Sequence, residues 1–217
     1  MKKINLVIFT IILITSIYPA YSQTEQSFAI PLTVIAAKQQ SVPETAVASL
    51  NDKLMQIITR NGMGTADYNS RFAITASIVT VTKNILAGPP RQYSETLNIT
   101  LYVVDNIDEK IFSSVTIPIK VVETTEEKAI IKAIQSVDIN SASLAEFVNL
   151  GRSKIIAYYK SHSDNIISKA QILASQNKYE AALFELNSIP VCCTEEFNKG
   201  VKVAKEIYNE ITEFLKK

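Results

Sequence analysis

Alternation of apolar and polar positions predicts four strands in the first two thirds of the chain. Each run has apolar residues at every second position, which is the period of a strand with one buried face. The four runs are Phe28, Ile30, Leu32, Val34; Phe72, Ile74, Ala76, Ile78; Leu97, Ile99, Leu101, Val103; and Ile111, Val115, Ile117, Ile119. Polar residues such as Thr96, Asn98 and Thr100 occupy the opposite positions, so we expect a sheet covered on one face only. Pro31 and Pro118 cannot donate to a ladder, which places their strands at edges.

Helical periodicity separates the first two strands and follows the last one. A stripe of Val47, Leu50, Leu54, Ile57 and Ile58 predicts a helix with a capping box at Ser41 and Glu44. A second capping box at Thr124 and Glu127 precedes another helix. From Ser143 onward, apolar residues recur in steps of three and four as far as Leu173, so the region is either one long helix or two helices that break near residues 161–164. Shorter helices follow over residues 179–186 and from Thr194 onward.

The order of these elements defines the expected fold class. The chain is predicted to be α+β, a β-α-β-β-β-α domain with a mostly antiparallel sheet covered on one face, plus a helical extension. We place the α+β domain at residues 23–138 and the helical domain at residues 139–217.

The first 22 residues have the pattern of a secretory signal peptide. Lys2 and Lys3 precede an uncharged apolar run over residues 4–17, and Pro19 precedes a cleavage site at Ser22-Gln23. The run is shorter than the roughly 20 residues that span a bilayer, although an uncleaved anchor remains the alternative. The leader resembles bacterial leaders of a kind common in Bacteroidetes, and we expect a periplasmic or secreted product.

Two parts of the chain resemble known families. Ala170, Leu173, Tyr179, Ala182 and Leu186 have the small and large spacing of a tetratricopeptide-type helical hairpin, which with so few units must pack on the α+β domain or on a partner.

The α+β region resembles the domain shared by the curli-secretion channel family, the lipoprotein activators of penicillin-binding proteins and the amino-terminal domain of the Tol translocation protein. The resemblance rests on residues 50–63, 71–77 and 99–105, with Asn106-Ile107-Asp108 where the family has Thr-Gly, and the chain has no lipobox cysteine. It implies an accessory protein of the bacterial envelope.

Composition excludes several classes of function. Hydrophobic residues make up 47% of the chain and the net charge is +1, so the chain is neither disordered nor a basic nucleic-acid platform. One histidine, His162, and two adjacent cysteines offer too few ligands for a zinc site. The sequence also lacks nucleotide-binding and hydrolase motifs, so we predict no cofactor and no enzymatic activity.

Cys192-Cys193 is the most unusual dipeptide of the chain. Its cysteines are interpreted as free and buried, as a strained vicinal disulfide, or as a cross-link to another chain. His162 lies on an apolar helical stripe and is interpreted as a partly buried packing residue. Asp105, Asp108 and Glu109 are interpreted as a solvated turn.

The predicted function is that of a non-enzymatic cell-envelope accessory protein that binds another envelope protein. The candidate partner-binding loop is Gly88, Pro89, Pro90 and Arg91, since loops often carry binding residues. The exposed strand edges and the concave side of the helical hairpin are further candidate surfaces. Membrane association is expected only through the partner, and a homo-oligomer is left open. The alternatives are a regulator of a cell-wall synthase and a thiol-dependent envelope enzyme.

Overall fold

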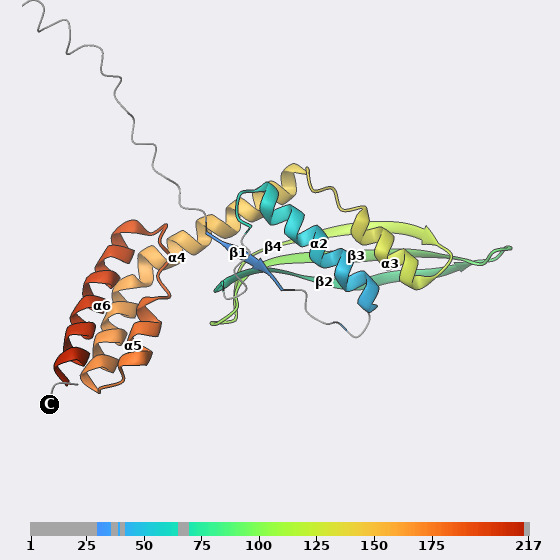
Figure 1. Cartoon of the computed structure of the whole chain (residues 1–217). Coiled ribbons are helices and arrows are strands. Elements are labelled where there is room, and N and C mark those ends of the chain that lie inside the picture. Colours follow the sequence, from blue (N-terminus) through green and yellow to red (C-terminus); the bar gives the residue numbers. More distant parts are fainter. Residues whose placement is uncertain (1–29, 36–38, 40–41, 65–69, 215–217) are drawn as a thin grey trace, which may run out of the picture.

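The computed structural model describes residues 30–35, 39, 42–64 and 70–214. The predicted signal peptide, Phe28 and Ser41 therefore lie outside the described residues. The elements, in chain order, are β1 (Leu32–Val34), α2 (Glu44–Arg60), β2 (Phe72–Leu86), β3 (Gln92–Asp105), β4 (Lys110–Glu123), α3 (Glu126–Gln135), α4 (Ala142–Ser175), α5 (Tyr179–Leu186) and α6 (Thr194–Phe214) (Figure 1).

The predicted α+β fold class is confirmed. A four-stranded sheet has the order β1-β2-β3-β4, with β1 parallel to β2 and the remaining neighbours antiparallel. Helices α2 and α3 lie side by side across one face of it (Figure 1). β4 is an edge strand, as Pro118 predicted, because an edge position needs no donor from that residue.

The core lies between this face of the sheet and the helices. The buried stripe of β3 alternates perfectly, and α2 and α3 contribute apolar side chains from one face each. The main contributors are Leu97, Ile99, Leu101 and Val103 from β3, Leu54, Ile57 and Ile58 from α2, and Ala133 and Ile134 from α3. The sequence patterns had assigned the listed residues of β3 and α2 to this core.

The predicted face of β4 is wrong at its first position. Ile111 is 59% exposed, whereas Phe112 is 4% exposed and packs into the core. The pairing register shifts here, because Val103 pairs with Ser113 while Val104 pairs with Ile111. Phe112 is thus the extra residue of a β-bulge, and a bulge moves the following residues to the opposite face.

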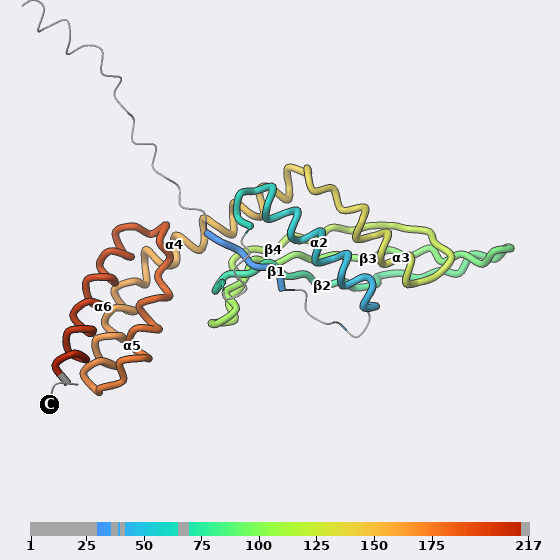
Figure 2. The backbone as a smooth tube through the Cα atoms, in the orientation of Figure 1, coloured from blue at the N-terminus to red at the C-terminus, as the bar shows by residue number. Residues whose placement is uncertain are grey.

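Helix α4 is continuous and joins the sheet to the C-terminal helices (Figure 2). Its first half packs on β4, while its second half, α5 and α6 form a helical bundle beyond one end of the sheet. This bundle has a core of its own, made of Ala170, Ala174, Ala182, Leu186, Val203 and Ile207. The N-cap of α4 is Ser141, two residues before Ser143, where the helical pattern in the sequence begins. The domain boundary near residue 138 remains a prediction.

Candidate functional site

The junction between the sheet and the helical bundle contains a cleft of about 630 Å³. One wall comes from the residues just before β1, the start of β2 with the residues before it, and the β3–β4 turn. The other wall comes from α5, the α5–α6 loop and the first turn of α6. Its lining includes Pro31, Arg71, Phe72, Ile107, Phe184, Ile189, Pro190, Val191, Cys192 and Phe197. A smaller lobe of about 240 Å³ adjoins it and shares Arg71, Phe184 and Ser188.

Large apolar side chains are exposed around this cleft. Ile107 is 48% exposed in the β3–β4 turn, Phe184 is 55% exposed on α5, and Val191 is 47% exposed in the α5–α6 loop. These residues come from three separate segments of the chain, and all three line the same cleft. Isolated exposed hydrophobic residues need no explanation, but a group of them around a concave surface is typical of an interaction site.

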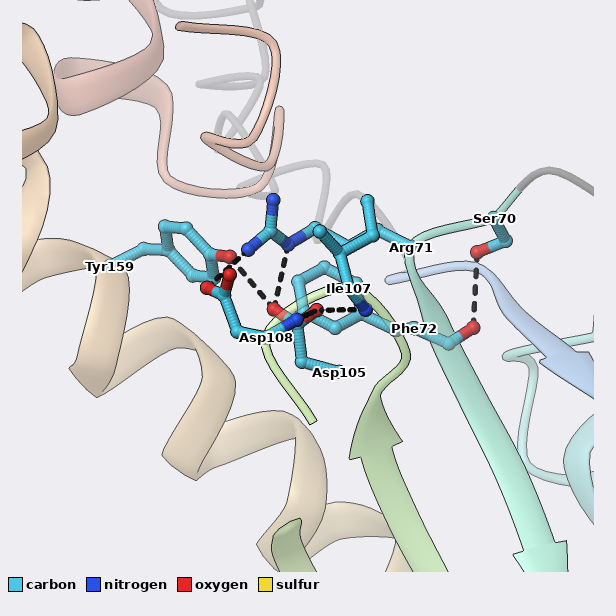
Figure 3. Close-up of polar contacts among 7 residues, drawn as sticks. All are labelled: Ser70, Arg71, Phe72, Asp105, Ile107, Asp108 and Tyr159. Carbon is cyan, nitrogen blue, oxygen red and sulfur yellow. Dashed lines mark hydrogen bonds and ion pairs between the residues drawn. The ribbon is translucent and has the colours of Figure 1, made fainter. Parts of the chain in front are cut away.

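Next to the cleft, a polar network connects Arg71, which directly precedes β2, with the end of β3, the β3–β4 turn and α4 (Figure 3). Arg71 Nε donates to Asp105 Oδ2 at 2.6 Å, and a second guanidinium nitrogen of Arg71 donates to Asp108. The backbone N–H groups of Ile107 and Asp108 donate to the other Asp105 oxygen at 2.9 and 3.0 Å. Tyr159 donates its hydroxyl to Asp105 across 3.3 Å.

This network holds fixed charges in a buried setting. Burial alone would lower the pKa of Arg71, but its hydrogen bond to Asp105 and the neighbouring carboxylates outweigh that effect and raise it. Burial is also the main reason why the pKa of Tyr159 lies far above its ordinary value. The guanidinium therefore stays charged and the phenol stays neutral. Because Asp105 accepts from four donors at once, its role is to position the turn against α4.

Asp105 corrects the prediction of a solvated turn. It is 1% exposed, although Asp108 and Glu109 in the same turn are exposed. A carboxylate is stable in such a position only with partners, and Arg71 is the partner that the sequence does not reveal. Arg71 lies far from Asp105 along the chain, and no local pattern connects the two residues.

His162 lies at the side of the smaller lobe, and its predicted partial burial is wrong. The side chain is exposed and stacks on Tyr158 with ring centroids 4.1 Å apart. Its Nδ1 lies 2.9 Å from the carbonyl oxygen of Tyr158. Lys110 Nζ lies 3.4 Å from the centroid of the same tyrosine ring. His162 therefore forms a cluster with Tyr158 and Lys110, and its own side chain stays accessible to solvent.

The two cysteines lie at the large cleft and are both free thiols. Cys192 is half-buried and lines the cleft, whereas Cys193 is fully buried with its Sγ 3.9 Å from the carbonyl oxygen of Ile156. A hydrogen bond from the Cys193 thiol, with the positive charge of Arg152, lowers the pKa of Cys192 to about 7 against the effect of burial. The same pairing raises the pKa of Cys193 above its ordinary range.

The other residues singled out in the sequence lie elsewhere. The loop of Gly88, Pro89, Pro90 and Arg91 is exposed at the tip of the β2–β3 hairpin, at the opposite end of the molecule from the bundle (Figure 1). Among the helical-hairpin residues, three are buried in the bundle core and two pack at its margin: Ala170, Ala182 and Leu186, then Leu173 and Tyr179. Within the described ranges, no group of three or more His, Cys, Asp or Glu side chains is arranged to hold a metal ion.

Comparison with known proteins gives no family for this chain. No family model and no curated relative matches it. The solved structures that resemble it include a minor lipoprotein from Acinetobacter baumannii, with 12% identity, a TM-score of 0.35, and coverage of 57% of this chain and 94% of that one. A DUF330 protein from Xanthomonas campestris has 14% identity, a TM-score of 0.33, and coverage of 63% and 90%. PelC from Paraburkholderia phytofirmans, solved as a dodecamer, has 14% identity, a TM-score of 0.31, and coverage of 51% and 89%.

These TM-scores are all below 0.5, so the likenesses assign no function to this chain. The solved proteins that resemble part of it do include a bacterial lipoprotein. Within the described part of the chain, none of the helices has the length and apolar character needed to cross a membrane.

Proposed function

We propose that this chain is a non-enzymatic accessory protein of the bacterial envelope that binds an apolar segment of another envelope protein in the junction cleft. The observation that carries the proposal is the convergence of Ile107, Phe184 and Val191, all exposed, on one cleft. The signal-peptide pattern of the first 22 residues supports an envelope location.

The chemistry of the cleft favours an apolar ligand segment. Arg71 is the charged residue in the lining, and its guanidinium is already bonded to Asp105 and Asp108, so it has little capacity left for an incoming group. Phe184 and Phe197 offer aromatic surface on the bundle side, and aromatic side chains dominate the energy of protein interfaces. An apolar anchor of a partner that inserts between them would bury surface worth about 25 cal/mol per Å².

In this proposal the α4–α5 hairpin acts like a tetratricopeptide unit that presents Phe184, and the rigid polar network keeps the opposite wall in place. The partner is an envelope protein, and a cell-wall synthase is the alternative that the family resemblance suggests. In this proposal the chain acts by binding its partner and catalyses no reaction.

Photo-cross-linking tests this proposal in intact cells. A benzophenone amino acid at position 184 of the full chain should give a cross-linked adduct, and so should one at position 107. Position 172 is the matched control, because Ile172 is 58% exposed on α4 but does not line the cleft. A second substitution, Val191→Glu, should reduce the adduct at position 184, because it places a charge in the apolar cleft.

The outcomes separate the alternatives. An adduct with one envelope protein at positions 184 and 107 but not at 172 supports the proposal, and mass spectrometry of that adduct shows whether the partner is a wall synthase. Equal labelling at position 172, no adduct at position 184, or an adduct that joins two copies of this chain would overturn it.

A further inference from the structure

The cleft also contains a chemical group that the binding proposal does not use, the Cys192-Cys193 dithiol. Cys192 faces the cleft, and Cys193 lies beneath it with no exposed surface. Phe197, Pro190 and Val191 line the cleft around Cys192. An accessible thiol in an apolar concave surface, next to a second buried thiol, is a site where a small molecule can both bind and react.

Two features favour the reactive form of Cys192. The Cys193 thiol donates to its sulfur, and Arg152 contributes positive charge, so the pKa of Cys192 falls to about 7. Near neutral pH, a large share of Cys192 is therefore thiolate, which is the nucleophilic form. Cys193 is the less reactive thiol, because it is fully buried and its pKa is raised.

We propose that Cys192 is a thiolation site that exchanges with disulfides whose organic groups fit the apolar cleft, and that the resulting mixed disulfide is retained. In this step the Cys192 thiolate attacks one sulfur of a disulfide R–S–S–R′. The S–S bond of the reagent breaks, a Cys192–S–S–R bond forms, and R′S⁻ leaves and takes up a proton from water. The reagent disulfide is the oxidant, so no further electron acceptor is needed.

The second thiol does not complete a redox cycle. To release R–S⁻, Cys193 would have to attack the Cys192 sulfur and form a disulfide between neighbouring residues. Neighbouring α-carbons are about 3.8 Å apart, whereas disulfides usually need about 4.4–6.8 Å. Cys193 is also buried and protonated, so the adduct on Cys192 should persist. The dithiol therefore resembles a site of modification more than the centre of a thiol oxidoreductase.

This inference is independent of the proposed protein partner. It concerns a small disulfide and the isolated full-length chain, so a missing partner leaves the test of Cys192 unchanged. Conversely, the cross-linking experiment uses positions 107, 172 and 184, none of which is a cysteine, so its outcome does not depend on the reactivity of Cys192.

Stoichiometric titration with dithiodipyridine, a neutral aromatic disulfide, tests the proposal. The native wild-type chain should release one equivalent of thiopyridone, and the unfolded chain should release two. Cys192→Ser should abolish the native reaction. Cys193→Ala should still release one equivalent, but with a pH midpoint above that of the wild type, because alanine offers Cys192 no side-chain hydrogen-bond donor.

The pH dependence of the rate gives a second readout on the wild type alone. The rate should reach half of its plateau near pH 7, whereas an ordinary thiol does so near 8.5. At pH 7 the gain in thiolate, reduced by the lower nucleophilicity of a more acidic thiol, makes Cys192 about threefold faster than an ordinary cysteine.

The cleft itself is tested by Phe184→Ser. This variant should react several-fold more slowly with dithiodipyridine and equally fast with the small polar hydroxyethyl disulfide. Release of two equivalents from the native wild type would show that the mixed disulfide on Cys192 is not retained. No release would show that the reagent cannot reach Cys192. Either result would overturn the proposal. A midpoint near 8.5, or an unaltered reaction of Cys192→Ser, would overturn the assignment to an activated Cys192.

Discussion

Gly151 on α4 lies where the helix crosses the sheet, and its replacement by alanine is a sensitive test of the packing. A β-carbon at this position would lie 2.7 Å from Ser113 Oγ and 3.0 Å from both Cβ and Cγ2 of Val103. Val103 belongs to the central strand β3 and is fully buried, so it has no room to move away.

Opposing effects determine how much Gly151→Ala changes the free energy of unfolding. Alanine stabilises a helix interior by about 1 kcal/mol relative to glycine. Overpacking of a core by one methyl group costs about 1–3 kcal/mol. If Ser113 rotates away, its hydrogen bond to the carbonyl oxygen of Phe147 is lost, which costs about 1 kcal/mol more. The net expectation is a loss of about 1–3 kcal/mol in the free energy of unfolding.

Gly200 on α6 provides the matched control. A β-carbon there would first meet Ile189 Cδ1 at 3.4 Å, which is ordinary contact, so Gly200→Ala should stabilise by about 0.5–1 kcal/mol through helix preference. Urea unfolding followed by far-ultraviolet circular dichroism measures both variants, since the chain has no tryptophan. Equal stabilisation by the two substitutions would refute the close packing of α4 on β3. Ser113→Ala should reduce the cost of Gly151→Ala in a double-mutant cycle.

Further expectations concern polar groups. Asp105→Asn should lower the free energy of unfolding by about 2–4 kcal/mol, because Arg71 loses its buried partner; a change below 0.5 kcal/mol in urea unfolding would contradict this. Burial raises the pKa of Glu95, so this group favours folding below its ordinary pKa and loses that contribution as pH rises through the raised value. Glu95→Gln should therefore stabilise the protein at pH 7 but not at pH 4, as thermal unfolding at both pH values will show. Glu109 has φ +52°, so Glu109→Gly should stabilise by about 0.5–1 kcal/mol in the same urea assay.

Much of the fold was accessible from the sequence because burial repeats with the period of each element. The apolar positions of β3 and α2 face a single core, so alternation and helical periodicity identify them directly. Phe112 shows the limit, because a bulge adds one residue and reverses the phase of the pattern. The sequence leaves open whether α4 is continuous through residues 161–164, since polar residues of these types also favour helix ends. In the structure, Ser161 Oγ donates to the carbonyl oxygen of Ala157 within the helix.

The cleft itself could not be predicted, because its parts are far apart in the sequence. Arg71, Ile107 and Phe184 come from different elements and meet only after α4 has placed the bundle against the end of the sheet. The predicted loop at residues 88–91 satisfied the usual criteria for a binding loop but lies at the other end of the molecule. Only Cys192 was a candidate from the sequence and also lines the cleft. The Cys192-Cys193 dipeptide is recognisable in the sequence without knowledge of the fold.

The position of α4 links the packing to the chemistry of the cleft. Gly151 lies against β3 and Ser113 of β4, and Tyr159, about two helical turns further on, bonds to Asp105 at the end of β3. These two contacts fix the direction of α4, which in turn carries α5 and packs against α6. A substitution that lifts α4 off the sheet at Gly151 should therefore also move the wall that holds Phe184 and Cys192. We expect Gly151→Ala to change the reaction rate of Cys192 with dithiodipyridine, whereas Gly200→Ala should leave it within a factor of two. An unchanged rate in a destabilised Gly151→Ala variant would show that the cleft is positioned independently of this contact.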